Sequence, residues 1–227
     1  TRFGDDVISR ITYGQTDANL TALHQTIIDC INQLTTELCK NASIEAADIY
    51  EMCVVGNTTM NHIFLKLPIA QLGHAPYRAY SLDAHDCPPG QLGLLMNPAG
   101  NVHTVENIAG FVGADTVAVA LAVDIASAEE MTLALDIGTN GEIVLGNREF
   151  MIACAASAGP AFEGSGISCG MRASKGAIQK VEIIPEDFRV NYKAIGDIAP
   201  KGICGSGYID LIAGMLRCGI LDKDGKI

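Results

Sequence analysis

Small polar residues that follow an acidic strand end are the part of the sequence best suited to chemistry. An apolar strand from Leu133, which we expect to be buried, leads to a group comprising Asp136, Gly138, Thr139, Asn140, Gly141 and Glu142. The glycines let backbone N–H groups turn toward a phosphate, and the threonine and asparagine add short hydrogen-bonding side chains. Asp136 could hold Mg²⁺ through water or orient a water for attack on a phosphate. The same string also fits an ordinary hairpin, because Asn-Gly strongly favours a two-residue turn.

Two further glycine-containing loops are each expected to lead into a helix. The first contains Gly56, Asn57 and Thr58, and the second contains Gly205, Ser206 and Gly207. Free N–H groups at a helix N-terminus favour an anion, so both loops are candidate phosphate contacts. A turn followed by an ordinary helix cap explains the same residue types, and Ser206 is a candidate cap.

Glu163 stands in a glycine-bounded stretch, Gly159–Gly164, where the backbone can come close to a ligand. Its carboxylate is a candidate Mg²⁺ ligand or water-positioning group. The alternative is a solvated glutamate in the first turn of a short helix, where the helix dipole favours an acid.

Several other chemical signatures are missing from the sequence. There is no Walker A string, no dinucleotide-binding Gly-x-Gly-x-x-Gly and no pair of cysteines within three positions. The cysteine spacing argues against a zinc ribbon or a ferredoxin-type cluster in this segment. We expect most of the eight cysteines to be small core residues, because free cysteine is commonly buried.

Periodic apolar residues predict the elements that must position these groups. Leucine and isoleucine recur three and four apart over 17–40, which predicts an amphipathic helix with Asp17 as its cap. A buried strand over 49–55 precedes the Gly56 loop, and a helix that Pro68 stops follows it. Small residues over 110–124 predict another helix. Strands are expected at 131–137, 142–146, 149–155, 178–184 and 188–192, a short helix within 159–168, and a last helix at about 206–218.

The composition predicts a folded chain with an acidic surface. Of the 227 residues, 48% are apolar and 18% charged, a balance that supports a substantial core. The formal net charge of −11 argues against non-specific binding to nucleic acid or to an anionic membrane. No apolar run approaches the roughly 18 residues of a spanning helix, so we expect a cytoplasmic protein. From both ends of the chain we expect this sequence to be a segment of a longer protein.

Five motifs, in order along the chain, resemble one family. Asp136-Ile-Gly-Thr is similar to the phosphate loops of the actin, hexokinase and heat-shock-chaperone superfamily. The longer string DIGTNGE at 136–142 resembles the second phosphate loop of the reductive activators of corrinoid proteins. The other four stretches are RFGDDVISR at 2–10, VVGNTTM at 54–60, AGPAFEG at 158–164 and GICGSGYID at 202–210.

The resemblance implies an α/β fold of two ribonuclease-H-like subdomains of the actin/hexokinase superfamily, both incomplete, at 1–128 and 129–227. It implies ATP and Mg²⁺ as ligands, with Asp136 and Glu163 as catalytic groups and Mg²⁺ held by Asp136 through water. The loops at 56–58, 138–142 and 205–207 would bind the nucleotide. The implied partner is a corrinoid protein whose cobalt is returned to Co(I), and the family's 2Fe–2S cluster would belong to an N-terminal ferredoxin domain outside this segment.

Two other functions remain open on the sequence. A small-metabolite kinase of the same superfamily would need a polar sugar cleft with an aspartate base, for which we find no convincing candidate. A non-catalytic module would instead dock on the corrinoid protein or form a homodimer, without any part for nucleotide. Phosphoryl transfer to a polyol would favour the kinase, and absence of Mg-ATP binding would favour the docking module.

Overall fold

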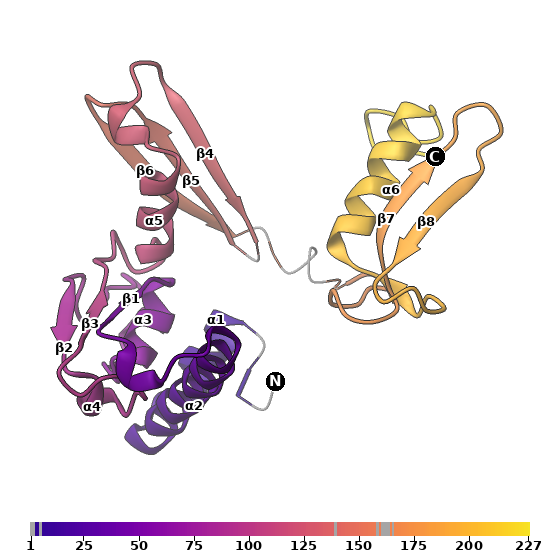
Figure 1. Ribbon diagram of the computed structural model, residues 1–227. Helices are drawn as coiled ribbons and strands as arrows, with labels where there is room; N and C mark the ends of the chain where they lie inside the picture. The colour runs from indigo at the N-terminus through magenta and orange to yellow at the C-terminus, as the bar shows by residue number, and fades with distance from the viewer. Residues whose placement is uncertain (1–2, 5, 139, 158, 160–163, 165) are drawn as a thin grey trace. The chain divides into compact units, whose positions relative to one another are not determined.

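The structure, a computed structural model, describes residues 3–4, 6–138, 140–157, 159, 164 and 166–227. Helices and strands are mixed along the chain (Figure 1). The α-helices are α1 (Val7–Tyr13), α2 (Asp17–Ala42), α3 (Thr58–Phe64), α4 (Pro89–Leu92), α5 (Ala114–Ala122) and α6 (Gly205–Arg217). The strands are β1 (Glu51–Val54), β2 (His85–Cys87), β3 (Asn101–Thr104), β4 (Thr132–Ile137), β5 (Asn140–Gly146), β6 (Met151–Ser157), β7 (Ala177–Ile183), β8 (Val190–Ala194) and β9 (Gly202–Ile203). The short 3-10 helices are η1 (Ala46–Asp48), η2 (Ala70–Gly73) and η3 (Ile125–Ser127).

The chain forms two compact units. The first unit comprises Thr1–Asp136 and Glu142–Ala155, and the second comprises Ile137–Gly141 and Ala156–Ile227. The division therefore passes through the tip of the β4–β5 hairpin, and the subdomain boundary expected at residue 129 stays a prediction. No helix in the described ranges has both the length and the apolar character needed to cross a membrane.

The first unit is built around a sheet with the strand order β1-β3-β2. β1 is parallel and β2 antiparallel to β3. One face of this sheet packs on α2 and α3, and Ile28, Phe64 and Val102 form the middle of that core. The helix predicted at 17–40 is confirmed as α2, although its N-cap is Thr16, whose hydroxyl accepts the Asn19 amide at 3.3 Å.

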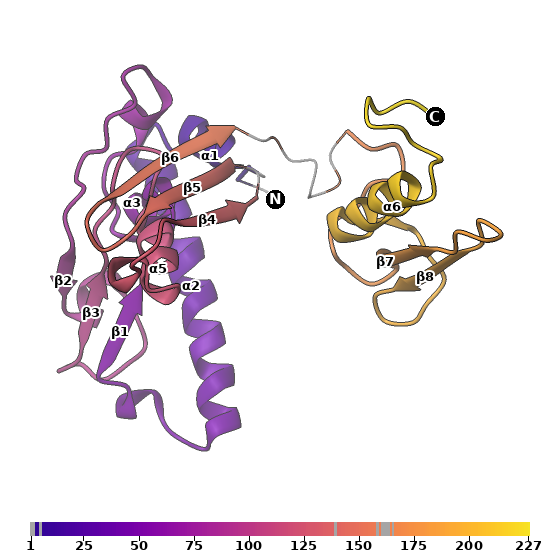
Figure 2. The same cartoon turned by 90° about the horizontal axis from the view of Figure 1, so that it is seen from above.

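A second sheet of the first unit has the strand order β4-β5-β6. Because only two residues separate β4 from β5, these strands form a tight antiparallel hairpin. Figures 1 and 2 show α5 lying along this sheet. The expectation that β4 is buried is wrong: Leu133, Leu135 and Ile137 are 57%, 54% and 65% exposed, and Asp136 is exposed as well. β4 is the edge strand of its sheet, so an apolar sequence there does not imply burial.

The second unit combines a sheet of order β8-β7-β9 with α6. β7 is antiparallel to β8 and parallel to β9. α6 packs on β7, and the core between them contains Val181, Ile183 and Ile203. The strands predicted near 178–184 and 188–192 and the last helix are confirmed to within two residues.

Several expected elements differ in extent. The helix expected at 110–124 begins only at Ala114, because Ala109 and Val112 pair in a tight turn before it. α3 ends at Phe64, before a positive φ of 55° at Lys66. β3 and β9, which span four and two residues, were not predicted. Half of the positions at 159–168, where a short helix was expected, lie outside the described residues.

The expectation that most cysteines lie in the core is wrong for half of them. Cys39, Cys87 and Cys204 are buried, Cys218 is half-buried, and the exposed ones are Cys30, Cys53, Cys154 and Cys169. Cys53 occupies an exposed position of β1, where burial alternates along the strand. An apolar run therefore places a cysteine in a sheet without deciding which face of the sheet it takes.

Candidate functional site

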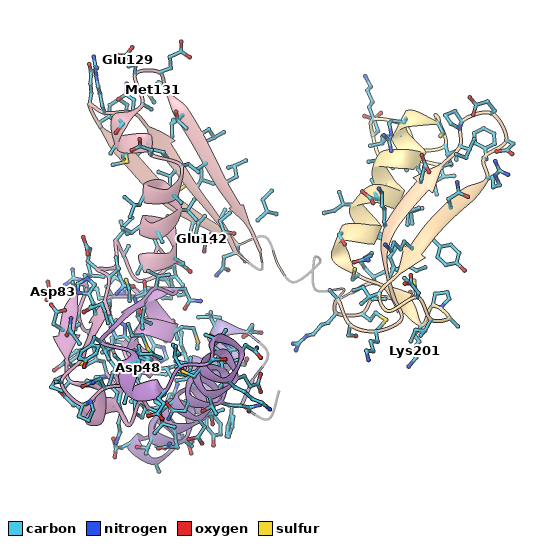
Figure 3. All side chains as sticks on the ribbon, viewed as in Figure 1. Asp48, Asp83, Glu129, Met131, Glu142 and Lys201 are labelled. Carbon is cyan, nitrogen blue, oxygen red and sulfur yellow. The ribbon has the colours of Figure 1, made fainter. Side chains whose placement is uncertain are left out.

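Three acidic side chains gather where β4 and β5 meet the start of α5. Asp136 is the penultimate residue of β4, Glu142 lies near the start of β5, and Asp115 lies in the first turn of α5. The charge of Asp136 acts on Asp115, and the charges of both act on Glu142. Figure 3 shows Glu142 at the end of the sheet where the hairpin turns. We call Asp115, Asp136 and Glu142 the acidic group.

Burial and like charge raise the pKa of two members of this group. The pKa of Asp115 lies above its usual value, first because the side chain is buried and then because of the negative charge of Asp136. The Thr116 amide donates to the Asp115 carboxylate at 2.9 Å and partly offsets this effect. Burial, followed by the charges of Asp115 and Asp136, raises the pKa of Glu142. A raised pKa makes a carboxylate a better proton acceptor near neutral pH.

Sequence reasoning found Asp136 and Glu142 but missed Asp115. The expected helix at 110–124 included Asp115 without assigning it a role. A signal was present, because Asp115 is the only charged residue between Glu106 and Asp124 in an otherwise apolar and polar-neutral stretch. An acid in the first turn of such a helix can also be explained without a functional role, because it interacts favourably with the helix dipole.

The loop Gly56–Thr58 lies against the start of α5, next to the acidic group. The Asp115 amide donates to the Gly56 carbonyl at 3.3 Å. A Cβ on Gly113 would come within 2.5 Å of Asn57 Cα and 2.6 Å of the Thr58 nitrogen, so only glycine allows this approach. The structure therefore brings a candidate phosphate loop and the acidic group together within the first unit.

Side chains in that loop already have internal partners. Asn57 caps α3 by accepting the Met60 amide at 2.9 Å. The Thr58 hydroxyl donates to the Ala109 carbonyl at 2.6 Å, and Thr58 is fully buried. Any contact of this loop with a ligand therefore falls to the backbone rather than to the Thr58 hydroxyl.

The hairpin turn between β4 and β5 is closed by its own backbone. The Gly138 amide donates to the Asn140 carbonyl at 3.0 Å. Asn140 and Gly141 are the first residues of β5 and are half-buried. Thr139 lies outside the described residues, and so does Glu163.

The loop Gly205–Gly207 belongs to the second unit and has a clear packing role there. α6 begins at Gly205 with Cys204 as its N-cap, so the expectation that Ser206 caps this helix is wrong. Ser206 instead donates its hydroxyl to the Gln179 carbonyl of β7 at 2.9 Å. A Cβ on Gly207 would come within 2.3 Å of the Ile178 oxygen, so glycine is needed for α6 to pack on β7.

The acidic group suits a magnesium ion held through water. Carboxylate oxygens are ligands that Mg²⁺ prefers, and a cation beside Asp115, Asp136 and Glu142 would offset the repulsion among them, which adds to burial in raising the pKa of Asp115 and Glu142. In the part of the chain that the structure describes, no three His, Cys, Asp or Glu side chains are close enough to hold a metal ion directly. An ion beside these carboxylates would therefore need water molecules among its ligands.

Comparison with known proteins adds the family. Residues 1–128 match the family model described as the RACo middle region, and residues 130–227 match the C-terminal domain of RACo, the ASKHA domain. The chain is 42% identical to the corrinoid activation enzyme RamQ of Eubacterium limosum, over 99% of this chain and 37% of that protein. It is 27% identical to the Co(II) methylated amine-specific corrinoid protein reductase of Methanosarcina barkeri, over 99% of this chain and 46% of that protein.

A solved structure agrees with these matches. The reductive activator for corrinoid, iron–sulfur protein superposes on the whole chain with a TM-score of 0.84 and 45% identity, over 36% of its own length. The chain thus spans less than half the length of the relatives that it matches. The α/β fold of the actin, hexokinase and sugar-kinase superfamily is confirmed. The chain belongs to the RACo family of reductive activators of corrinoid proteins.

Proposed function

We propose that the protein containing this chain is an ATP-dependent reductive activator that returns the cobalt of a corrinoid protein from Co(II) to Co(I). The acidic group beside the Gly56–Thr58 loop carries the nucleotide part of this proposal. Relatives named as a corrinoid activation enzyme and as a corrinoid protein reductase support the choice of partner.

The residues of this chain divide the work around the nucleotide. Asp136 would hold Mg²⁺ through water, and the loops at 138–141 and 56–58 would each bind phosphate through their backbone amides. Asp115, whose pKa is raised, would accept the one proton that the attacking water loses, and Glu142, whose pKa is also raised, lies beside it. Glu163 and the 205–207 loop, which the family resemblance adds to the site, stay part of this proposal. Bound Mg²⁺ would neutralise charge on the phosphates.

Nucleotide supplies the driving force for a difficult reduction. One electron converts Co(II) to Co(I), and we propose that it comes from a low-potential iron–sulfur cluster elsewhere in the protein. A nucleotide that binds one conformation of the activator–corrinoid complex more tightly shifts the complex toward that conformation by the difference in binding free energy. Such a shift makes an unfavourable transfer proceed when the selected conformation favours Co(I).

The setting in this proposal is the cytoplasm. All eight cysteines are free thiols, as expected where glutathione and thioredoxin keep thiols reduced. The net charge of −11 supports a protein partner rather than nucleic acid or an anionic membrane. A homodimer stays a prediction.

Calorimetry with Mg-ATP on the full-length protein tests the nucleotide site. We expect the wild type to bind Mg-ATP and Asp136→Ala to bind at least tenfold more weakly, because it loses the carboxylate that holds the ion. Asp29→Ala on α2 removes the same charge from an exposed position and serves as the matched control. Equal binding by all three proteins would remove Asp136 from the site, and no binding by the wild type would overturn the proposed function.

A further inference from the structure

Asn107 joins α3 to α5, the helix that carries Asp115. Its side-chain oxygen accepts a hydrogen bond from Asn61 Nδ2 at 3.0 Å, and Asn61 lies in α3. The same oxygen accepts the Ala114 amide at 3.3 Å, and Ala114 is the first residue of α5. One buried amide thus links the helix that follows the Gly56–Thr58 loop to the helix that carries Asp115.

The orientation of both amides is fixed by this arrangement. A backbone N–H can only donate, so the Asn107 atom facing Ala114 must be the oxygen. The Asn61 atom facing that oxygen must then be its NH₂ group. Asn107 and Asn61 are only 9% and 3% exposed, so water does not readily replace either bond.

α5 needs such an acceptor because its own cap supplies none. The N-cap residue, Gly113, has no side chain, and no side-chain cap hydrogen bond is made there. The first N–H groups of a helix have no partner within the helix. Asn107, seven residues before α5, therefore caps the helix from outside it. The amide that it caps belongs to Ala114, the residue next to Asp115.

We propose that Asn107 is a positioning residue, which fixes the start of α5 against α3 and so holds the Asp115 carboxyl beside Asp136 and Glu142. This inference rests on the proposed function for its effect on turnover. The hydrogen-bonding role itself is independent of nucleotide. Asn107 does not touch the reacting atoms, and its contribution passes through the Ala114 amide and the backbone of Asp115.

Three variants of the full-length protein test the hydrogen bonds that Asn107 makes to Asn61 and Ala114. Asn107→Leu keeps the size of the side chain and removes the acceptor, whereas Asn107→Asp keeps an acceptor oxygen facing Ala114. Asn32→Leu is the matched control: Asn32 on α2 accepts the Leu95 amide at 2.8 Å and donates to the Gly93 carbonyl at 2.9 Å, in the same unit and away from the acidic group.

The first measurement is amide hydrogen exchange at Ala114–Thr116 without nucleotide, corrected for the global stability of each variant. We expect about tenfold faster exchange in Asn107→Leu, because the Ala114 amide loses its acceptor. Asn107→Asp should restore most of the protection, and Asn32→Leu should leave it unchanged. Unchanged exchange in Asn107→Leu would overturn the proposal that Asn107 fixes the start of α5.

The second measurement is Mg-ATP turnover. We expect kcat to fall at least tenfold in Asn107→Leu while KM for ATP stays within about threefold, because the displaced group acts on the attacking water rather than on nucleotide binding. Asn107→Asp should recover part of kcat, and Asn32→Leu should stay within about twofold of the wild type. Faster exchange with unchanged kcat would overturn the positioning role. Absence of turnover in the wild type would overturn the proposed function. The exchange data would still decide whether Asn107 fixes the start of α5.

Discussion

Asp115 carries a charge that its surroundings disfavour. Its pKa is raised by burial and by the charge of Asp136, so the folded protein binds a proton at Asp115 more readily than the unfolded chain does. At neutral pH the ionised side chain therefore reduces stability. This is the pattern of a functional site, where stability is lost in exchange for a useful arrangement of charge.

Replacement of Asp115 by Asn should raise stability and lower activity. We expect Asp115→Asn to increase the melting temperature at pH 7 by a few degrees at most, since a partly exposed charge pair is worth about 1 kcal/mol or less. Mg-ATP turnover should fall at least tenfold. The gain in stability should shrink as the pH is lowered through the folded-state pKa, where wild-type Asp115 becomes neutral. A loss of stability at pH 7 would contradict the assigned repulsion.

His62 makes stability depend on pH in the opposite direction. Burial lowers its pKa, and the ring bridges the Thr58 carbonyl at 2.7 Å and the Tyr80 and Ser81 amides at 3.2 and 3.3 Å. Nε2 must be unprotonated to accept these amides, so the folded state holds the neutral ring. The unfolded chain then binds more protons as the pH falls below the ordinary histidine value of 6.5.

Denaturant unfolding between pH 8 and pH 5.5 should reveal this histidine. We expect the free energy of unfolding to be constant above about pH 7 and to fall below pH 6.5, with a slope of up to about 1.4 kcal/mol per pH unit from this one group. His62→Gln should be less stable at pH 8 but should show a flatter profile. Equal slopes in the two proteins would assign the loss to other histidines.

Contact between the Gly56–Thr58 loop and the start of α5 is the element-scale feature that builds the site. Gly113 permits it, because a side chain there would meet the backbone of Asn57 and Thr58. The loop connects β1 to α3, and α5 leads through η3 to β4, so this one contact joins elements that belong to both sheets of the first unit. Within the contact the Asp115 amide donates to the Gly56 carbonyl at 3.3 Å, and the Asn107 side chain links the two helices that follow.

Substitution of Gly113 by Ala should separate these elements. We expect a loss of about 2 kcal/mol or more in the free energy of unfolding of the first unit, because the new methyl group overlaps backbone atoms that cannot rotate away. Gly90→Ala is the control, since a Cβ at Gly90 in α4 meets nothing within 4 Å. Guanidinium titrations followed by circular dichroism measure both. Equal stabilities of the two variants would show that the Gly56–Thr58 loop moves away from residue 113 without a loss in the free energy of unfolding.

Charge is divided unevenly over the whole molecule. The first unit contains 6 Lys and Arg against 18 Asp and Glu, a net charge of −12, and the second contains 9 against 8, a net charge of +1. Like charges in one compact unit repel each other and oppose folding. Salt screens such repulsion over about 10 Å at 0.1 M.

Added salt should therefore stabilise the first unit. We expect its melting temperature to rise by a few degrees between 0.02 and 0.3 M NaCl, measured by calorimetry on the full-length protein. The double variant Asp29→Lys, Glu37→Lys changes exposed side chains of α2 and should show a smaller rise. A melting temperature that falls with salt, or an identical response of the variant, would contradict this view of the acidic surface.

Local sequence determined the main helices and the β4–β5 hairpin of this protein. Apolar periodicity predicted α2 and α6, and the string at 136–142 predicted the β4–β5 hairpin and its family, because both depend on residues within a few positions of one another. Asp136 and Glu142 could be named as candidates from the sequence, since they flank the turn itself.

Only the tertiary structure decided which distant residues meet. Asp115 lies 21 positions before Asp136, and Asn107 lies 46 positions after Asn61, so no local pattern could join them. The exposure of β4 was equally beyond the sequence, because an apolar strand is buried or exposed according to its place in the sheet. The physical reason is the same in each case: packing over long sequence separations fixes distance, burial and charge, and these together set the chemistry of a carboxylate.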